Sequence, residues 1–327
     1  MAEALLRVEG LGKHFHGHGL GRWRRRGVQA VADASFVLRR GETLGLVGES
    51  GCGKSTLARL VLNLIVPDRG RVVLDDEDFT HAPRGQQRRL RRRLQIVFQD
   101  ALSSLNPRMT VGVNIAEPLR LQGIGGLAAH REATRALLDL VGLRPDDAEK
   151  YPHEFSGGQC QRIAIARALV LRPDIVVYDE AVSALDVSIR AQILRLILDL
   201  QQQRRLSYLF ISHDLGVVRR VSDRIAVMYL GRIVEVGAAQ DVCSAPLHPY
   251  TGALLRAIPL PDPRRMRVRD LGLAEGEAAG PLAAGAGCVF HDRCPRRMPR
   301  CAADRPALAE VTPGRAVACF LHHAAAA

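Results

Sequence analysis

Lysine is nearly absent from this chain of 327 residues. Of its 46 Lys and Arg side chains, only Lys13, Lys54 and Lys150 are lysines. The net charge of +12 therefore reflects a general preference for arginine, and we give a nucleic-acid function little weight. Aromatic residues make up only 4%, so aliphatic side chains must form the core. There is no apolar run as long as a bilayer span and no signal-peptide pattern, which favours a cytosolic protein that reaches a membrane only through a partner.

A glycine-rich segment lies between an apolar run and a stretch of helical periodicity. Residues Gly48–Thr56 fit the pattern G-x-x-x-x-G-K-[ST] of the phosphate-binding P-loop. The run Thr43–Val47 before it predicts a buried parallel strand, and Leu57, Leu60, Val61 and Leu64 predict a helix after it. Backbone N–H groups of such a loop point inward at phosphates, and the helix N-terminus adds partial positive charge. We therefore expect a nucleotide site formed by Gly48, Glu49, Ser50, Gly51, Cys52, Gly53, Lys54, Ser55 and Thr56.

A second apolar run, Ile175–Tyr178, ends in two adjacent carboxylates, Asp179 and Glu180. This is the Walker B arrangement of nucleotide hydrolases. We expect Asp179 and the Ser55 hydroxyl to hold Mg²⁺, and Glu180 to orient and polarise the attacking water. Lys54 is expected to reach the β- and γ-phosphates.

Between these motifs, Phe155–Gln159 reads Phe-Ser-Gly-Gly-Gln and precedes an arginine- and alanine-rich helical stretch. The segment resembles the signature motif of the ATP-binding cassette (ABC) ATPases, and further motifs follow in that family's order over about the first 240 residues. The chain departs from the family pattern at Cys160, where arginine is common, and at Ala101 and Ala181, which replace prolines.

The resemblance implies a role for each matching residue. Gln99 would be the glutamine of the Q-loop, near the γ-phosphate and Mg²⁺, and His213 the histidine that contacts the γ-phosphate. An early aromatic usually stacks on adenine; Phe15 is the stronger candidate and Trp23 the weaker. The signature residues would bind the γ-phosphate of an ATP held by a second cassette; they are Ser156, Gly157, Gly158 and Gln159.

The alternation of strand and helix patterns predicts an α/β fold: a P-loop ABC ATPase core over residues 1–240, with a helical insert at about 100–158. Residues 241–327 are expected to form a small extension that contains cysteines, after a linker-like segment at about 260–286. Arginine clusters at 22–26 and 88–93 are interpreted as solvated surfaces; contact with anionic lipid or an acidic partner is the alternative.

Four cysteines cluster in the extension, at Cys288, Cys294, Cys301 and Cys319. In a cytosolic protein they are better explained as metal ligands than as disulfides. Their long, uneven spacing differs from the paired CxxC of zinc sites and favours a 4Fe-4S cluster, with zinc or free thiols as alternatives. The segments Pro246–Thr251 and Gly287–Pro295 also resemble the C-terminal extension of oligopeptide/dipeptide (peptide/nickel) importer ATPases, of the F-type subunit.

The resemblance implies an ATPase subunit that powers uptake of di- and oligopeptides or similar solutes, bound peripherally to the cytoplasmic face of the inner membrane. The implied partners are a second ATPase subunit, a paralogue more than a copy, two transmembrane permeases and an extracytoplasmic solute-binding protein. The alternative is a soluble ABC ATPase acting on nucleic acid or ribosomes, which the basic charge favours superficially.

Overall fold

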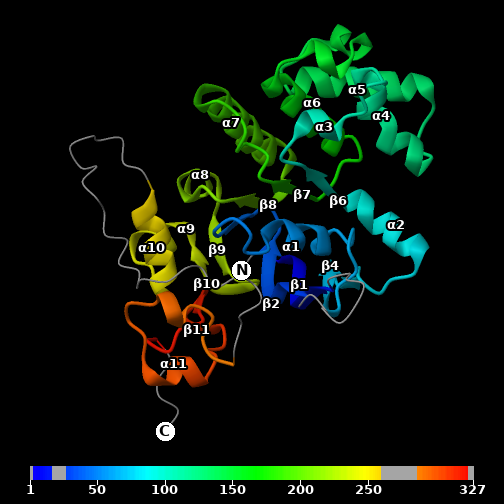
Figure 1. Cartoon of the computed structure of the whole chain (residues 1–327). Helices are drawn as coiled ribbons and strands as arrows, with labels where there is room; N and C mark the ends of the chain where they lie inside the picture. Colours follow the sequence, from blue (N-terminus) through cyan, green and yellow to red (C-terminus); the bar gives the residue numbers. More distant parts are fainter. Residues whose placement is uncertain (1–2, 17–26, 259–285, 323–327) are drawn as a thin grey trace, which may run out of the picture. The chain divides into compact units, whose positions relative to one another are not determined.

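Strands and helices alternate along the chain, as expected for an α/β protein (Figure 1). The computed structural model describes residues 3–16, 27–258 and 286–322. Trp23, the arginine cluster at 22–26 and nearly all of the linker-like segment lie outside the described residues. None of the described helices is long and apolar enough to cross a bilayer.

Two compact units make up the described chain, and they do not follow the boundary expected near residue 240. One contains Arg39–Glu42 and Ala82–Ile211, and we call it the signature unit. The other contains Ala4–Leu38, Thr43–His81 and the described part of Ser212–Ala327, and we call it the P-loop unit. The C-terminal extension thus shares a unit with the P-loop. A domain division at residue 240 stays a proposal.

The P-loop unit is built on strands in the order β5-β4-β1-β2-β10-β9-β3. β1 pairs antiparallel with β4, β9 antiparallel with β10, and β3 parallel with β9. All five residues of β3 are buried, so the strand that leads into the P-loop is part of the core. The strands are β1 (Ala4–Phe15), β2 (Val28–Arg39), β3 (Thr43–Val47), β4 (Arg69–Leu74), β5 (Glu77–Asp78), β9 (Arg224–Tyr229), β10 (Arg232–Ala238), β11 (Ala309–Thr312) and β12 (Arg315–Val317).

Short helices accompany these strands. They are α1 (Lys54–Val61), α8 (Leu215–Val221), α9 (Ala239–Ser244), α10 (Pro249–Ala257), η4 (His291–Arg293) and α11 (Pro299–Ala303). The helix predicted after the P-loop is confirmed, but it ends at Val61, and Leu64 is 54% exposed. Asn63, with φ of 50°, takes the left-handed conformation just past the helix end, which turns the chain away before Leu64.

The signature unit contains three parallel strands, β6 (Leu94–Val97), β7 (Ile175–Asp179) and β8 (Ser207–Ser212), and β7 pairs with both of its neighbours. Every residue of β7 and β8 is buried. The expected helical insert is present: α3, α4 and α5 each pack on α6 (Figure 1). The helices are α2 (Arg84–Arg93), α3 (Ala101–Ser104), α4 (Val111–Gln122), α5 (Leu127–Leu140), α6 (Gly157–Leu169), α7 (Val187–Arg204), η1 (Pro145–Glu149) and η2 (Pro152–Glu154).

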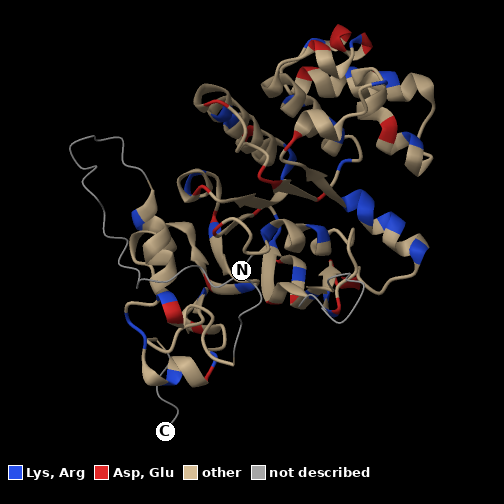
Figure 2. Cartoon of the chain, in the orientation of Figure 1, with Lys and Arg blue, Asp and Glu red and all other residues tan. Residues whose placement is uncertain are grey.

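The second arginine cluster lies on α2, where Figure 2 colours much of the ribbon as basic residues. Several of them bind this same unit. Arg92 donates to the Gln122 side chain at 2.9 Å, and Arg93 forms an ion pair with Asp174 at 2.5 Å. Arg88 donates to the Leu121 carbonyl. The solvated-surface interpretation therefore holds only in part, because these arginines tie α2 to α4 and to the start of β7.

The C-terminal extension is joined to the core by strand pairing and by one buried ion pair. β12 pairs antiparallel with β10, with Glu235 opposite Val317. Glu235 is 0% exposed, and its carboxylate accepts hydrogen bonds from the backbone N–H groups of Leu247 and His248 at 3.0 and 2.9 Å. It also pairs with Arg315 at 2.9 Å. One side chain of β10 therefore binds both the start of α10 and the first residue of β12.

Replacement of Glu235 by Gln should lower the free energy of unfolding of this unit by about 3 kcal/mol. The amide leaves Arg315 without its counter-ion and turns an NH₂ group toward the backbone N–H of either Leu247 or His248, which then loses its acceptor. Chemical denaturation followed by circular dichroism measures the effect. The control is Glu9→Gln, which removes an exposed pair with Arg71 and should cost about 0.5 kcal/mol. Equal midpoints for the two variants would contradict the anchoring role.

Candidate nucleotide-binding site

The P-loop is packed so closely against its neighbours that two of its glycines have no room for a side chain. A Cβ on Gly48 would lie 2.2 Å from the Met228 carbonyl oxygen and 2.7 Å from Cys52 Sγ. A Cβ on Gly53 would lie 2.1 Å from the Ala30 carbonyl oxygen, and Gly53 has φ of 106°. The Gly231 N–H also donates to the Cys52 carbonyl at 2.8 Å. The β9–β10 hairpin thus packs against the P-loop, and its turn donates a hydrogen bond to it.

Lys54 begins α1 and is buried, with only 4% of its surface exposed. Its ammonium donates to the carbonyl oxygens of Gly48 and Glu49, at 2.8 and 2.9 Å. The Lys54 ammonium is thus enclosed by the backbone of the P-loop. Loops of this kind bind the phosphates of a nucleotide at that position. Burial raises the pKa of the neighbouring Cys52 thiol. Cys52 is therefore a packing residue of the loop and not a nucleophile.

The two carboxylates of the Walker B motif end strand β7 in the signature unit. Asp179 is buried, with 6% exposed. Glu180 follows with φ of 51°, a left-handed conformation that is costly for a residue with a side chain. Its N–H donates to the Ile211 carbonyl at 3.0 Å, and its own carbonyl accepts from the Ser183 hydroxyl at 2.8 Å. These bonds hold the strained backbone of Glu180 in place at the end of β7.

Gln99 and His213 both lie just beyond the ends of strands. Gln99 follows β6 and is exposed, and the next residue, Asp100, caps α3 by accepting from the Ser103 N–H. His213 follows β8 and is also exposed, and Asp214 caps α8 by accepting from the Val217 N–H. Each residue is therefore held between a buried strand and a capped helix, with its side chain open to solvent.

The signature residues form the start of α6, as expected. Ser156 is the N-cap, and its hydroxyl accepts from the Gln159 N–H while the Gln159 side chain accepts from the Ser156 N–H. This capping box leaves the N–H groups of Gly157 and Gly158 at the exposed helix end. A Cβ on Gly158 would lie 2.5 Å from Ile189 of α7. The helix end is thus a site with anion-binding character.

Phe15 ends β1 with 41% of its surface exposed, so its ring is available for stacking. The ammonium of Lys13 lies 5.9 Å from the centre of the ring. Trp23, the weaker candidate for the adenine contact, lies outside the described residues.

The four clustered cysteines line one small cavity together with Phe290, Met298 and Phe320. Burial raises the pKa of Cys288 and Cys294, and burial together with the other three sulfurs raises the pKa of Cys319 to about 11. No disulfide links the cysteines of the described chain. Within the described ranges, no group of three or more Cys, His, Asp or Glu side chains is arranged to hold a metal ion. The four thiols therefore lie around one cavity, but they are not arranged as ligands of a single metal ion.

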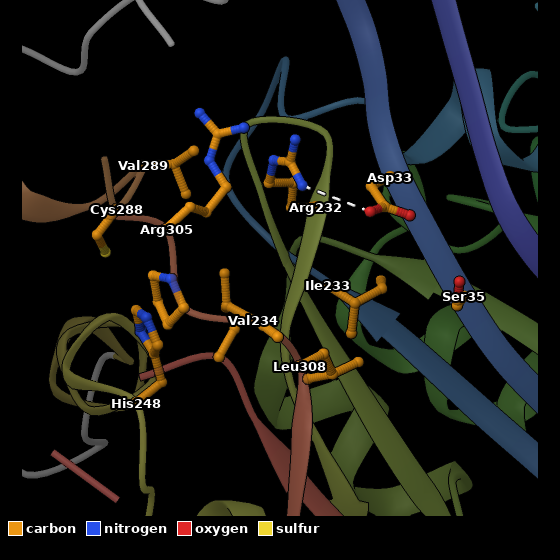
Figure 3. A pocket seen from close by; sticks show the side chains of 13 residues that line it. Asp33, Ser35, Arg232, Ile233, Val234, His248, Cys288, Val289, Arg305 and Leu308 are labelled. Carbon is orange, nitrogen blue, oxygen red and sulfur yellow. Dashed lines mark ion pairs between the residues drawn. The ribbon is translucent and has the colours of Figure 1, made fainter. Parts of the chain in front are cut away.

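A larger cavity of about 270 Å³ adjoins the cysteines and shares Cys288 and His248 with their cavity (Figure 3). Arg232 turns toward Asp33, at 3.7 Å, and Arg305 lies nearer to Cys288. Burial lowers the pKa of His248 to about 3, so this ring is neutral, and its Nδ1 accepts from the Tyr250 N–H. The cavity contains no residue of the nucleotide motifs. Its lining mixes the charged residues Asp33, Arg232 and Arg305 with apolar side chains.

Sequence reasoning missed the residues that hold Glu49. Arg293 of the extension forms two parallel hydrogen bonds with the Glu49 carboxylate, at 2.9 and 3.0 Å. The hydroxyl of Tyr250 accepts from the Glu49 N–H at 2.9 Å. Both residues lie in segments singled out by the family resemblance, Pro246–Thr251 and Gly287–Pro295, but both contacts span more than 200 positions, so nothing local revealed that they bind Glu49.

Replacement of Gly48 by Ala should weaken binding of MgATP by about tenfold or more. The added methyl group must push the P-loop away from the Met228 carbonyl, which displaces the N–H groups that face the phosphates. Titration with a fluorescent ATP analogue measures the dissociation constant. Gly85→Ala is the matched control, because a Cβ at that position on α2 meets nothing within 4 Å. Affinity equal to that of the control would refute the packing constraint.

Comparisons with known proteins agree with this geometry. The family model for ABC transporters matches residues 31–183, and that of the oligopeptide/dipeptide transporter C-terminal region matches residues 234–301. The oligopeptide transport ATP-binding protein OppF of Salmonella typhimurium is 49% identical over 86% of this chain and 84% of its own length. The "Probable peptide ABC transporter ATP-binding protein y4tS" of Sinorhizobium fredii is 49% identical over the full chain and 92% of its own length.

Solved structures give the same family. The ATP-binding cassette MJ0796, in a dimeric post-hydrolysis state with ADP and Pi, has a TM-score of 0.63 at 26% identity, covering 72% of this chain and 98% of its own. CbiO1 of Clostridium perfringens, part of the ABC transporter complex CbiONQ, has a TM-score of 0.64 at 26% identity, covering 74% and 92%. The expected ABC ATPase fold is confirmed. The chain belongs to the ATP-binding proteins of ABC transporters, within the peptide and oligopeptide group.

Proposed function

We propose that this chain hydrolyses ATP to drive the uptake of di- and oligopeptides or similar solutes by a membrane importer. The observation that carries the proposal is the combination, in one compact unit, of the phosphate-binding loop Gly48–Thr56 and a C-terminal region of the oligopeptide/dipeptide transporter family. The names of both curated relatives point to the same substrate class. The alternative of an ATPase acting on nucleic acid or ribosomes gains no support from these relatives.

The P-loop unit binds the nucleotide in this proposal. N–H groups of Gly48–Thr56 and the Lys54 ammonium contact the β- and γ-phosphates, and Phe15 stacks on the adenine. The buried ammonium of Lys54, already directed at the carbonyl oxygens of its own loop, supports the first contact. The exposed ring of Phe15 supports the second.

The hydrolytic step uses residues that follow three buried strands. Glu180 accepts a proton from water as the water attacks the γ-phosphorus, the bond to the β-phosphate oxygen breaks, and ADP and phosphate leave. His213 hydrogen-bonds the γ-phosphate and so orients it. Ser55, Asp179 and Gln99 would hold Mg²⁺ through the oxygen ligands that this ion prefers, and the ion would supply positive charge against the phosphates. The strained backbone of Glu180 supports its role, because such strain is common where a side chain must be aimed.

The signature residues act on a second molecule of nucleotide. Ser156, Gly157, Gly158 and Gln159 bind the γ-phosphate of an ATP held on the P-loop of a partner cassette. The exposed N-terminus of the 13-residue helix α6 supports this, because its N–H groups and dipole favour an anion. Two cassettes then close on two nucleotides and separate after hydrolysis. The related cassette MJ0796 was solved as a dimer.

Replacement of Glu180 by Gln should reduce steady-state ATP hydrolysis by about a hundredfold or more while MgATP still binds, because the amide cannot accept the proton of the attacking water. Phosphate release and equilibrium binding are measured side by side. Glu132→Gln, on the exposed face of α5, is the control and should keep full turnover. Unchanged hydrolysis by the Glu180 variant would remove this residue from the mechanism.

The proposal places the chain at the cytoplasmic face of the inner membrane as a peripheral subunit. Its partners are two transmembrane permeases, a solute-binding protein that acts through them, and a second ATPase subunit that is a paralogue. The similarity to an oligopeptide transport ATP-binding protein named OppF supports the F-type assignment. The helical insert and the Q-loop residue Gln99 are where the permeases are expected to bind.

The proposal extends to a 4Fe-4S cluster held by Cys288, Cys294, Cys301 and Cys319. The support is that all four sulfurs line one cavity, since four thiolates form the ligand set of such a cluster. Because burial raises the pKa of three of the thiols, binding must release their protons. The cluster would give the extension a rigid centre.

Protein purified without oxygen should contain about four iron and four sulfide per chain, with broad visible absorbance, and Cys288→Ser should remove most of both. Cys243→Ser is the control, because Cys243 lies on α9 and does not line the cavity. Elemental analysis also tests the alternatives. One zinc without iron would establish a zinc site, and absence of both would establish free thiols.

A further inference from the structure

Glu49, the second residue of the P-loop, is held by the C-terminal extension. Arg293 grips its carboxylate with two parallel N–H···O bonds, at 2.9 and 3.0 Å, and the Tyr250 hydroxyl accepts its backbone N–H. Such a two-bond pair fixes orientation as well as distance. Two other P-loop contacts stay close to the loop: Lys54 donates to the Gly48 carbonyl, and the Gly231 N–H of the hairpin turn donates to the Cys52 carbonyl. Glu49 is the P-loop residue to which Arg293 and Tyr250 of the extension are hydrogen-bonded.

Arg293 is itself placed rigidly. It ends the short helix η4, is 9% exposed, and directly precedes Cys294. Its guanidinium lies 5.8 and 5.9 Å from the ring centres of Tyr229 and Phe290, and donates to the Tyr229 hydroxyl at 3.4 Å. Tyr229, Tyr250 and Phe290 pack on one another with ring centres 4.6 to 5.5 Å apart. The arginine is thus part of a packed cluster between the cysteine cavity and the loop.

The charge of Glu49 makes this contact matter for nucleotide binding. The P-loop attracts a triphosphate by gathering N–H dipoles and one ammonium, and a carboxylate in the same loop opposes that attraction. Paired with Arg293, the carboxylate is neutralised and turned to a fixed direction. Without the arginine, the negative charge is left beside the phosphates, and the loop gains freedom at its second residue.

We propose that Arg293 is a positioning residue for MgATP: by neutralising and fixing Glu49, it keeps the P-loop in the form that accepts the triphosphate. The inference rests on the proposed nucleotide function of the loop. It makes the cysteine-lined extension a required part of the nucleotide site, because the residue that transmits its position is the neighbour of Cys294. The extension then sets the affinity for nucleotide through one ion pair.

The test is a double-variant cycle on the full chain, with the dissociation constant for a fluorescent ATP analogue and Mg²⁺ as the readout. Arg293→Gln should weaken binding by about tenfold, because it leaves the Glu49 charge unpaired. Adding Glu49→Gln to that variant should restore affinity to within about threefold of the wild type, since the repelling charge is gone. Arg293→Lys keeps the charge but not the two parallel bonds. Its affinity for the ATP analogue should lie between those of Arg293→Gln and the double variant.

The control is Arg297→Gln, an equal change of charge on an exposed residue of the same segment, which should bind as the wild type does. A purely structural role for Arg293 predicts that the double variant stays as weak as the single one, and that result overturns the inference. Wild-type affinity in Arg293→Gln overturns it as well. Failure of the proposed function looks different: the wild type itself would then bind no MgATP, and the inference would fall with it.

Discussion

The close packing of the P-loop against the turn of the β9–β10 hairpin is the constraint on which the rest of the structure depends. Gly48 faces the Met228 carbonyl with no room for a side chain, and the Gly231 N–H binds the Cys52 carbonyl. β9 also pairs with β3, the strand that enters the loop. A single hairpin therefore contacts the P-loop in two ways: β9 pairs with the strand that precedes the loop, and residues at the hairpin turn pack on the loop itself. Any displacement of that hairpin moves the groups that face the phosphates.

The same hairpin carries the C-terminal extension, so the two parts share one support. Tyr229, at the end of β9, packs on the rings of Tyr250 and Phe290, and Glu235 on β10 binds the start of α10 and Arg315. This sharing explains why the extension belongs to the compact unit of the P-loop and not to a unit of its own. The extension gains its stability by adding β12 to the edge of β10 and by packing Tyr250 and Phe290 on Tyr229 of the core.

Motifs with local chemistry were predictable from the sequence, and contacts between distant segments were not. The P-loop, the strand that ends in Asp179 and the signature helix follow from glycine positions and apolar runs, which act within a few residues. The helix expected through Leu64 ends early because of a left-handed residue that no periodicity marks. Arg293 could not be assigned, because its partner Glu49 lies 244 positions away and one arginine among many carries no signal.

The ion pair with Arg293 holds Glu49 in a way that apolar packing could not. An apolar contact at this place would be non-directional and would leave the loop free to rotate, and a buried charge pair adds little stability over apolar packing. A two-bond arginine–carboxylate pair adds direction, which a phosphate-binding loop needs more than it needs stability. The cost of burying the arginine is offset by the faces of Tyr229 and Phe290 and by the Tyr229 hydroxyl. The aromatic cluster therefore surrounds the guanidinium of Arg293, and it also contacts the P-loop directly, because the Tyr250 hydroxyl accepts from the Glu49 N–H.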